Sequence, residues 1–211
     1  MARTARLSNE IVDRVARDAA LSPYFVVLMA MSGVLAAVAL LANSVPVLLG
    51  AMIVAPAFPP FALVAFALVG DRPRLALTGL VTALLGILTA VAFAMLTTWI
   101  VERAGIITED ADLLHRPLLE ERLRPGWYSV IAAFAAGIAG TLATYRGKMD
   151  ALIGTVASVA LVPAGGAAAI ALMEQDHLRA LGGAVLLAIN AGVIVAIAIL
   201  VLLLLEIAQP R

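Results

Sequence analysis

The sequence predicts an all-α polytopic membrane protein, in which six transmembrane helices form two inverted three-helix repeats. Three observations predict this fold class: the composition, the number of long apolar runs and an internal repeat. Hydrophobic residues make up 64% of the 211 residues and charged residues only 13%, and the mean hydropathy is +1.08. An ordinary soluble domain has roughly 25% charged residues, and a chain of this length buries only about 70% of its surface on folding. The excess of apolar side chains therefore requires a bilayer.

Six apolar runs contain no charged residue, and each is long enough to cross a hydrocarbon core about 30 Å thick. They cover residues 24–42, 45–70, 75–101, 127–145, 151–173 and 181–205. The chain accordingly divides into an N-terminal segment (1–22), a first three-helix repeat (23–101), a polar extracytoplasmic loop (102–126), a second three-helix repeat (127–205) and a short tail (206–211).

The N-terminal segment contains an amphipathic helix over residues 7–20. Its apolar residues recur at helical spacing, with charged residues on the opposite face; they are Leu7, Ile11, Val12, Val15 and Ala19. Two interpretations stay open. The helix lies on the membrane surface before the first span, or it contacts a partner within an oligomer.

The distribution of basic residues predicts the orientation in the membrane. With the N-terminus inside, nine basic residues fall on inner segments and five on outer ones. The inner set is Arg3, Arg6, Arg14, Arg17, Arg72, Arg74, Arg146, Lys148 and Arg211, and the outer set is Arg103, Arg116, Arg122, Arg124 and Arg179. We therefore expect a multi-pass protein of the cell membrane with its N-terminus and C-terminus in the cytoplasm.

An internal repeat relates the two halves of the chain. Sequence similarity at a fixed spacing indicates a fold that is built from repeated structural units. A shift of 104 residues places Tyr24 on Tyr128, and it aligns further glycines and prolines without a gap: Gly33 with Gly137, Gly50 with Gly154, Pro59 with Pro163, and Gly79 with Gly183. Each half has three spans, so the second half enters the membrane from the opposite side. The repeat is therefore inverted, as in many transporters and channels. Chance similarity between hydrophobic helices is the alternative.

Prolines interrupt the middle span of each half. Pro56, Pro59 and Pro60 fall in the second span, and Pro163 falls in the fifth, just before two glycines. Because proline removes a backbone donor and clashes with the preceding turn, we predict that the second and fifth helices are broken at these prolines. Broken helices within a membrane commonly line a cavity, where the freed backbone groups meet a solute. A packing kink between helices is the alternative.

The predicted substrate-binding site lies at the two breaks and includes the small and polar residues near them. Its candidate residues are Asn43, Ser44, Gly50, Pro56, Pro59, Pro60, Ser158, Pro163, Gly165, Gly166 and Asn190. Asn43 and Ser44 stand at the turn between the first two spans. Asn190 lies near the middle of the sixth span, opposite Gly86 in the repeat, and either lines the site or bonds to a neighbouring helix.

The segment that contains Asn43, Ser44, residues 50–56 and the pair Pro59 and Pro60 resembles the hallmark of a bacterial and archaeal membrane-protein family called domain of unknown function 389. Family members are also similar in three further elements, which here are residues 22–24, residues 160–163 and Asn190. The resemblance covers most of residues 10–205. Where members have two prolines, this chain has Pro163 and Ala164, which weakens the second break. The resemblance implies the membrane fold and no substrate.

The sequence excludes several function classes. Fourteen Lys and Arg balance fourteen Asp and Glu, so the chain has no electrostatic footprint for nucleic acid, and it has no cysteine. His115 and His177 lie in loops without metal-ligand spacing, and no nucleophile elbow is present. A proton relay would need ionisable residues within the spans, and no ionisable residue lies well inside any of them. We expect no enzymatic activity, no cofactor and no metal site.

Two functions stay open. The first is a small-solute or ion permease or channel with its site at the paired broken helices. The second is a non-transporting membrane scaffold or lipid-interacting assembly, which the amphipathic helix and a stripe of small residues favour; the stripe consists of Ala132, Ala136, Gly140 and Thr144. We expect the lipid bilayer and further copies of the chain as partners, since one six-span bundle has little room for a cavity. The solute is not identified.

Overall fold

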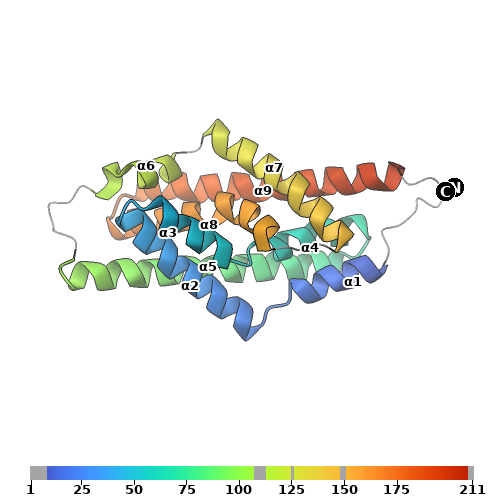
Figure 1. The fold of residues 1–211 in the computed structure, drawn as a ribbon, viewed down its shortest axis with the longest axis horizontal. Coiled ribbons are helices and arrows are strands. Elements are labelled where there is room, and N and C mark those ends of the chain that lie inside the picture. The colour runs from blue at the N-terminus through green and yellow to red at the C-terminus, as the bar shows by residue number, and fades with distance from the viewer. Residues whose placement is uncertain (1–8, 107–112, 125, 148–150, 209–211) are drawn as a thin grey trace.

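The computed structural model describes residues 9–106, 113–124, 126–147 and 151–208, and it is all-α in these residues (Figure 1). For residues 113, 151–160 and 208 only the backbone is described. The elements in chain order are α1 (Asn9–Asp18), α2 (Pro23–Leu41), α3 (Val45–Val54), α4 (Phe58–Val69), α5 (Pro73–Arg103), the 3-10 turn η1 (Leu113–His115), α6 (Pro117–Leu123), α7 (Trp127–Arg146), α8 (Ala151–Met173) and α9 (His177–Ala208).

Four of the described helices, α2, α5, α7 and α9, are long and apolar enough to cross a membrane. The pair α3 and α4, which meet at an angle of 46°, makes a fifth if it is counted as one span. Helix α8 has 23 residues, and the part with described side chains, Leu161–Met173, is a shorter apolar helix. Helices of this length, number and hydropathy are those of a polytopic membrane protein.

The two longest helices, α5 and α9, run in opposite directions along the longest axis of the molecule (Figure 1). Helix α8 packs against both of them, and so does α4, while α2 packs on α5 and α7 on α9. With 31 and 32 residues, α5 and α9 are roughly 46 to 48 Å long, well over the roughly 30 Å of a hydrocarbon core. Helices of this length fit a bilayer by tilting.

Polar contacts define one end of the bundle, which we call the α1 end. Asp13 of α1 forms an ion pair with Arg72 in the turn between α4 and α5. Arg14 Nη2 donates to the carbonyl oxygens of Thr144 at 2.8 Å and Tyr145 at 3.2 Å, in the last turn of α7. Helix α1, the α4–α5 turn and the C-terminus of α7 therefore lie at the same end.

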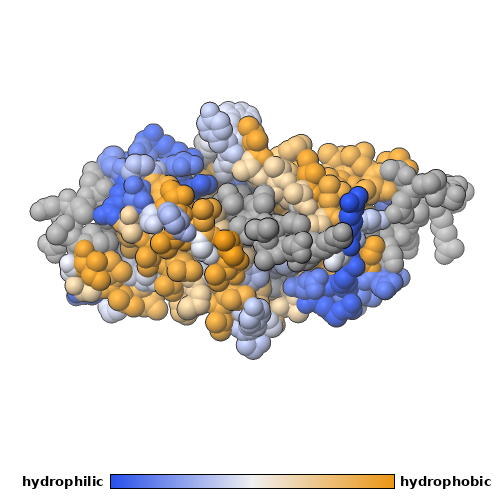
Figure 2. Space-filling model, in the orientation of Figure 1, coloured by the Kyte–Doolittle hydropathy of each residue, from blue (hydrophilic) through white to orange (hydrophobic). Residues whose placement is uncertain are grey.

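A second set of contacts defines the opposite end, which we call the α6 end. The backbone N–H of Leu118 in α6 donates to Asn43 Oδ1 at 3.2 Å, in the α2–α3 turn. Arg179 Nη2, near the start of α9, lies 3.4 Å from His115 Nε2. Figure 2 shows hydrophilic surface over α6 and around α1, with hydrophobic surface between them. This is the polarity that a membrane-spanning molecule needs.

The helix α1 has the amphipathic character that the sequence predicts, and its apolar face is used within the chain. Val12, Val15 and Ala19 are fully or almost fully buried, and α1 packs against α4. The contact is thus intramolecular, in addition to the polar contacts of Asp13 and Arg14 with neighbouring segments.

Glycines let the helices of each half approach closely. Two glycines that are 104 positions apart face residues that are also 104 positions apart. A Cβ atom at Gly33 of α2 would lie 2.1 Å from the carbonyl oxygen of Ala90 in α5. In the second half, a Cβ atom at Gly137 of α7 would lie 3.2 Å from the carbonyl oxygen of Ile194 in α9. Both the glycines and the residues that they face are 104 positions apart.

The same correspondence holds for a second pair of glycines. A Cβ atom at Gly79 of α5 would lie 2.8 Å from the carbonyl oxygen of Pro60 in α4. A Cβ atom at Gly183 of α9 would lie 3.2 Å from the carbonyl oxygen of Ala164 in α8. Pro60 and Ala164 are again 104 positions apart.

The small-residue stripe of α7 faces the interior of the chain. Ala136, Gly140 and Thr144 are buried, and a Cβ atom at Gly140 would lie 2.3 Å from the ring of Phe58. Gly140 therefore makes room for a bulky aromatic ring at the start of α4. The buried part of this stripe contacts helices of the same chain.

Candidate functional site

The break in the second predicted span lies at residues 55–57, between α3 and α4. Ala55 is extended, with φ −72° and ψ 117°, which is the conformation that a following proline imposes. Pro56 therefore ends α3. Pro59 and Pro60 stand in the first turn of α4, where helices tolerate proline because the N–H groups there have no intrahelical partner. The predicted break of the second helix is confirmed, and Pro56 is the residue that causes it.

The backbone at the break is arranged so that few donors face the apolar interior. Because Pro59 and Pro60 have no N–H group, the N-terminus of α4 lacks two of the usual four free donors. On the other side of the break, the buried hydroxyl of Ser32 in α2 donates to the carbonyl oxygen of Ala51 at 2.8 Å. A helix start with so few amides is poorly suited to hold an anion.

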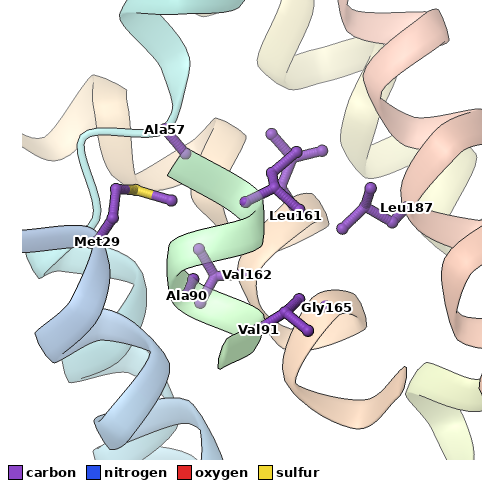
Figure 3. Close-up of a pocket in the computed structure, with 9 residues that line it drawn as sticks. Met29, Ala57, Ala90, Val91, Leu161, Val162, Gly165 and Leu187 are labelled. Atoms are coloured by element: carbon purple, nitrogen blue, oxygen red, sulfur yellow. The ribbon is translucent and has the colours of Figure 1, made fainter. Parts of the chain in front are cut away.

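A small cavity adjoins the break, and helices of both halves line it (Figure 3). Its lining is apolar: Met29 from α2, Ala57 from the break, Ile87, Ala90 and Val91 from α5, Leu161, Val162 and Gly165 from α8, and Leu187 from α9. The volume of this cavity is only about 10 Å³. This is about the space for one water molecule, and apolar cavities of this kind stay dry.

The predicted break in the fifth helix is wrong. Helix α8 runs without interruption from Ala151 to Met173, with Pro163 inside it. The repeat places Ala160 opposite Pro56 and Ala164 opposite Pro60, so the second half has a single proline where the first has three. One proline within a membrane helix is tolerated, because neighbouring helices and small local adjustments satisfy the freed backbone groups.

The other candidate residues of α8 lie at different places in the packing. Gly165 lines the cavity at the break. Gly166 faces α2, where a Cβ atom would lie 3.2 Å from that of Ala36. The side chain of Ser158 lies outside the described residues. Gly165 is thus a candidate residue of α8 that lies at the break.

The candidates that precede the break lie toward the α6 end. Asn43 has a positive φ of 50° and, with Ser44 at the N-cap of α3, forms the turn between α2 and α3. Its side chain accepts a hydrogen bond from α6. At Gly50, an added Cβ would meet nothing within 4 Å. The structure therefore does not bring Asn43, Ser44 and Gly50 together with Pro56, Pro59 and Pro60 at one cavity.

Asn190 joins α9 to α7. It is fully buried, and its Nδ2 donates to Ser129 Oγ at 2.8 Å. In the first half the equivalent positions are Gly86 and Phe25, and a Cβ atom at Gly86 would lie 2.8 Å from the ring of Phe25. A hydrogen bond in one half thus takes the place of an aromatic ring packed over a glycine in the other, so Asn190 serves helix packing.

Titratable groups of interest lie at the α6 end. Partial burial and the neighbouring carboxylate of Glu102 raise the pKa of Glu174, which follows α8. Arg179 Nε lies 3.5 Å from Asp176 Oδ2. Within the described residues, no group of three or more His, Asp or Glu side chains is placed to hold a metal ion.

Sequence reasoning missed most of the cavity lining. Met29, Ile87, Leu161 and Leu187 are aliphatic or thioether side chains in apolar helices, and such residues carry no chemical signature. Only Gly165, at a proline-glycine segment, was identifiable from composition.

Comparison with known proteins places the chain in a family. A relative from Methanocaldococcus jannaschii, which bears the name of an uncharacterised protein, is 26% identical over 159 residues, which are 75% of this chain and 47% of the relative. This chain therefore spans about half the length of that relative. No solved structure matches the chain. The family model with the description Domain of unknown function (DUF389) matches residues 52–197, from the end of α3 to the middle of α9. Because this match covers more than half of the sequence, the chain belongs to the DUF389 family.

Proposed function

We propose that the chain is a membrane permease or channel for a small solute or ion, built from two inverted repeats and closed at the α3–α4 break. The observation that carries this proposal is the cavity at the break, which helices of both halves line. A broken helix at the interface of two repeats is where transporters of this architecture bind their substrates.

The inverted repeat is supported by the glycine contacts. Gly33 faces Ala90 as Gly137 faces Ile194. The two glycines are 104 positions apart, and so are the two residues that they face. Helix order supports it as well, because α4 contacts α9 in the way that α8 contacts α5. With α3 and α4 counted as one span and α8 as another, each half has three spans, and the second half enters from the opposite side.

The apolar lining acts as the gate in this proposal. A constriction lined by aliphatic side chains excludes water when it is narrow, and channels use such dewetting to close. Leu161 and Val162 of α8 and Met29 of α2 surround a space for about one water molecule. Movement of α8 relative to α5 would widen this space and expose the backbone at the break.

A polar substitution in the gate tests the proposal. Leu161→Asn keeps a similar side-chain size but hydrates the constriction, so we expect higher flux of potassium, chloride or glycerol in proteoliposomes than with the unchanged chain. Leu186→Asn in α9 is the matched control, since Leu186 is as buried as Leu161, at 1% exposure, and does not line the cavity. It should cost similar stability without raising flux.

The dry cavity also favours the second function, a non-transporting scaffold or lipid-interacting assembly. Vesicles that stay tight to all three probes with the unchanged chain and with Leu161→Asn, while both fold, would support the scaffold and contradict the permease.

We also propose that the chain forms a homo-oligomer, that it has no enzymatic activity, and that both termini are cytoplasmic. The exposed apolar surfaces of α2 and α7, for example Val27 and Ile131, are available for contacts between copies. Cross-linking in native membranes would test the assembly.

A further inference from the structure

Helix α1 bridges the two halves of the chain at the α1 end. Asp13 pairs with Arg72 in the α4–α5 turn of the first half. A Cβ atom at Gly70, directly after α4, would lie 3.1 Å from Val12 Cγ2. On its other side, Arg14 reaches the last turn of α7 in the second half, and Figure 1 shows α1 beside α4 and the end of α7. One short helix thus holds together two segments that belong to different repeats.

The contact with α7 is polar and is directed at the end of that helix. Arg14 Nη2 lies 2.8 Å from the carbonyl oxygen of Thr144 and 3.2 Å from that of Tyr145. A cation at this place faces the negative end of the helix dipole. Gly147, which follows α7 with a positive φ of 69°, leaves room for the guanidinium, because a Cβ atom there would lie 2.8 Å from Arg14 Nη1. Arg14 is therefore the residue through which α1 holds α7.

The two helices that α1 holds also meet beside the break. Helix α4 begins at Phe58, and a Cβ atom at Gly140 of α7 would lie 2.3 Å from the Phe58 ring. Phe58 directly follows Ala57, which lines the small cavity. Helices α4 and α7 therefore form a boundary between the two halves, which we call the α4–α7 seam. It runs from the cavity to the α1 end, where Arg14 bridges it.

The repeat places an equivalent arrangement at the α6 end. Helix α6 packs on α8, which packs on α2, and the backbone N–H of Leu118 in α6 donates to Asn43 after the end of α2. At a shift of 104 residues, Leu118 corresponds to Arg14 and Asn43 to Gly147. The bridging contact thus occurs twice in one chain with different chemistry, so it belongs to the architecture of the repeat.

We propose that α1 is a latch on the α4–α7 seam, and that its release from α7 opens a route for water from the α1 end to the break. Helix α6 is the corresponding latch at the other end. With both latches closed, the cavity at the break has space for only about one water molecule. This inference rests on the proposed function, because it takes the break as the place that a solute must reach, yet access of water to the break can be measured without a solute.

A cysteine at the break reports release of the latch, because the chain has no native cysteine. Ala57 is 4% exposed, so Ala57→Cys in the full chain should react slowly with a membrane-impermeant methanethiosulfonate, in right-side-out and in inverted vesicles. Adding Arg14→Gln removes the charge and shortens the side chain that contacts α7. We expect a roughly tenfold faster reaction, about the factor that a favourable charge at a helix end contributes to an equilibrium, and only from the side that carries α1.

Three further variants in the Ala57→Cys background make the test specific. Arg17→Gln removes the same charge from an exposed position of α1 and should leave the rate unchanged. Arg14→Lys keeps a cation that can donate to helix carbonyls and should restore most of the slow rate. Asn43→Gly removes the acceptor of the α6 contact at a positive φ that suits glycine, and should speed the reaction from the α6 side only.

Two controls accompany these variants. Arg17→Cys alone identifies the side of the membrane that carries α1. Equal elution and equal helical content show that the variants fold.

Equal reaction rates with Arg14→Gln and with Arg17→Gln would overturn the proposal. So would a rate that Arg14→Gln raises equally from both sides, since that result shows general loosening of the bundle and no opened seam. Failure of the proposed function looks different. A faster, one-sided reaction in a chain whose vesicles stay tight to potassium, chloride and glycerol, with Leu161→Asn as well, would support the latch and contradict only the permease.

Discussion

At the residue scale, packing in this protein depends on where a side chain is absent. Gly33 lets the backbones of α2 and α5 touch, whereas Gly50 in α3 has open space around it. Both glycines belong to helices that cross or enter the membrane, and the sequence alone does not distinguish their roles. The difference depends on which helix lies opposite, which is a property of the tertiary packing.

Alanine substitution at these two glycines should have opposite effects. Gly33→Ala places a Cβ atom 2.1 Å from a backbone oxygen that cannot rotate away, so we expect a loss of roughly 1–3 kcal/mol, the usual cost of overpacking. Gly50→Ala meets nothing within 4 Å and should gain up to about 1 kcal/mol of helix propensity. Unfolding in mixed detergent micelles, followed by circular dichroism, measures both. Equal effects of the two substitutions would contradict the close contact.

Glu174 should make the stability depend on pH. Burial and Glu102 raise its pKa, so the folded protein holds this proton more tightly than the unfolded chain does. The free energy of unfolding should therefore fall as the pH rises from the ordinary carboxyl value of 4.5 through the higher folded-state value. Glu174→Gln removes this loss: the variant should be more stable at neutral pH, with the difference vanishing below that window. Parallel pH profiles would exclude the effect.

Asn190 shows what a repeat can and cannot predict about single residues. The sequence places Asn190 opposite Gly86, yet it leaves open whether the amide meets a solute or a helix. Its actual partner, Ser129, is the repeat equivalent of Phe25, which packs over Gly86. Equivalent residues thus keep their spatial relation while their chemistry changes, and this relation depends on the tertiary packing.

At the element scale, the spans were largely predictable, whereas of the two predicted helix breaks only the one in the second span is correct. Uncharged runs of membrane length predict α2, α5, α7 and α8 to within two residues, because a charge inside lipid is costly. The same runs could not separate a broken helix from a continuous one. Pro56 imposes an extended residue before it and ends α3, whereas Pro163 is accommodated by the surrounding helices.

Replacing Pro163 should therefore stabilise α8. The helix continues on both sides of Pro163, so Pro163→Ala restores one backbone hydrogen bond without a change of path. We expect a gain of up to about 3 kcal/mol, the propensity difference between the two residues, in the same micelle unfolding assay. Pro59→Ala is the matched control: Pro59 lies in the first turn of α4, where the new N–H group has no intrahelical acceptor. A destabilised Pro163→Ala would show that the proline fixes a bend that packing requires.

At the scale of the whole molecule, short helices precede two of the long apolar helices: α1 precedes α2, and α6 precedes α7. Val15 of α1 and Ala19, directly after this helix, are buried, and so are Leu119 and Leu123 of α6, which stand 104 positions later. Helix α1 packs on α4, and α6 packs on α8 and α9. The correspondence at a distance of 104 residues therefore extends beyond the apolar runs to α1 and α6, which lie at opposite ends of the bundle.

Cysteine labelling tests this arrangement, because the chain has no native cysteine. Arg17→Cys and Arg146→Cys introduce thiols at exposed positions of the α1 end, and Glu121→Cys and Leu178→Cys do so at the α6 end. A membrane-impermeant maleimide should react with the first pair only in inverted vesicles and with the second pair only in right-side-out vesicles, as the excess of basic residues on the α1 side predicts. Reversed labelling of both pairs would turn the molecule over in the membrane and leave the fold intact. Labelling of Arg17→Cys and Arg146→Cys from different sides would mean that an odd number of membrane crossings separates α1 from the end of α7. The inverted repeat requires an even number, so this result would contradict it.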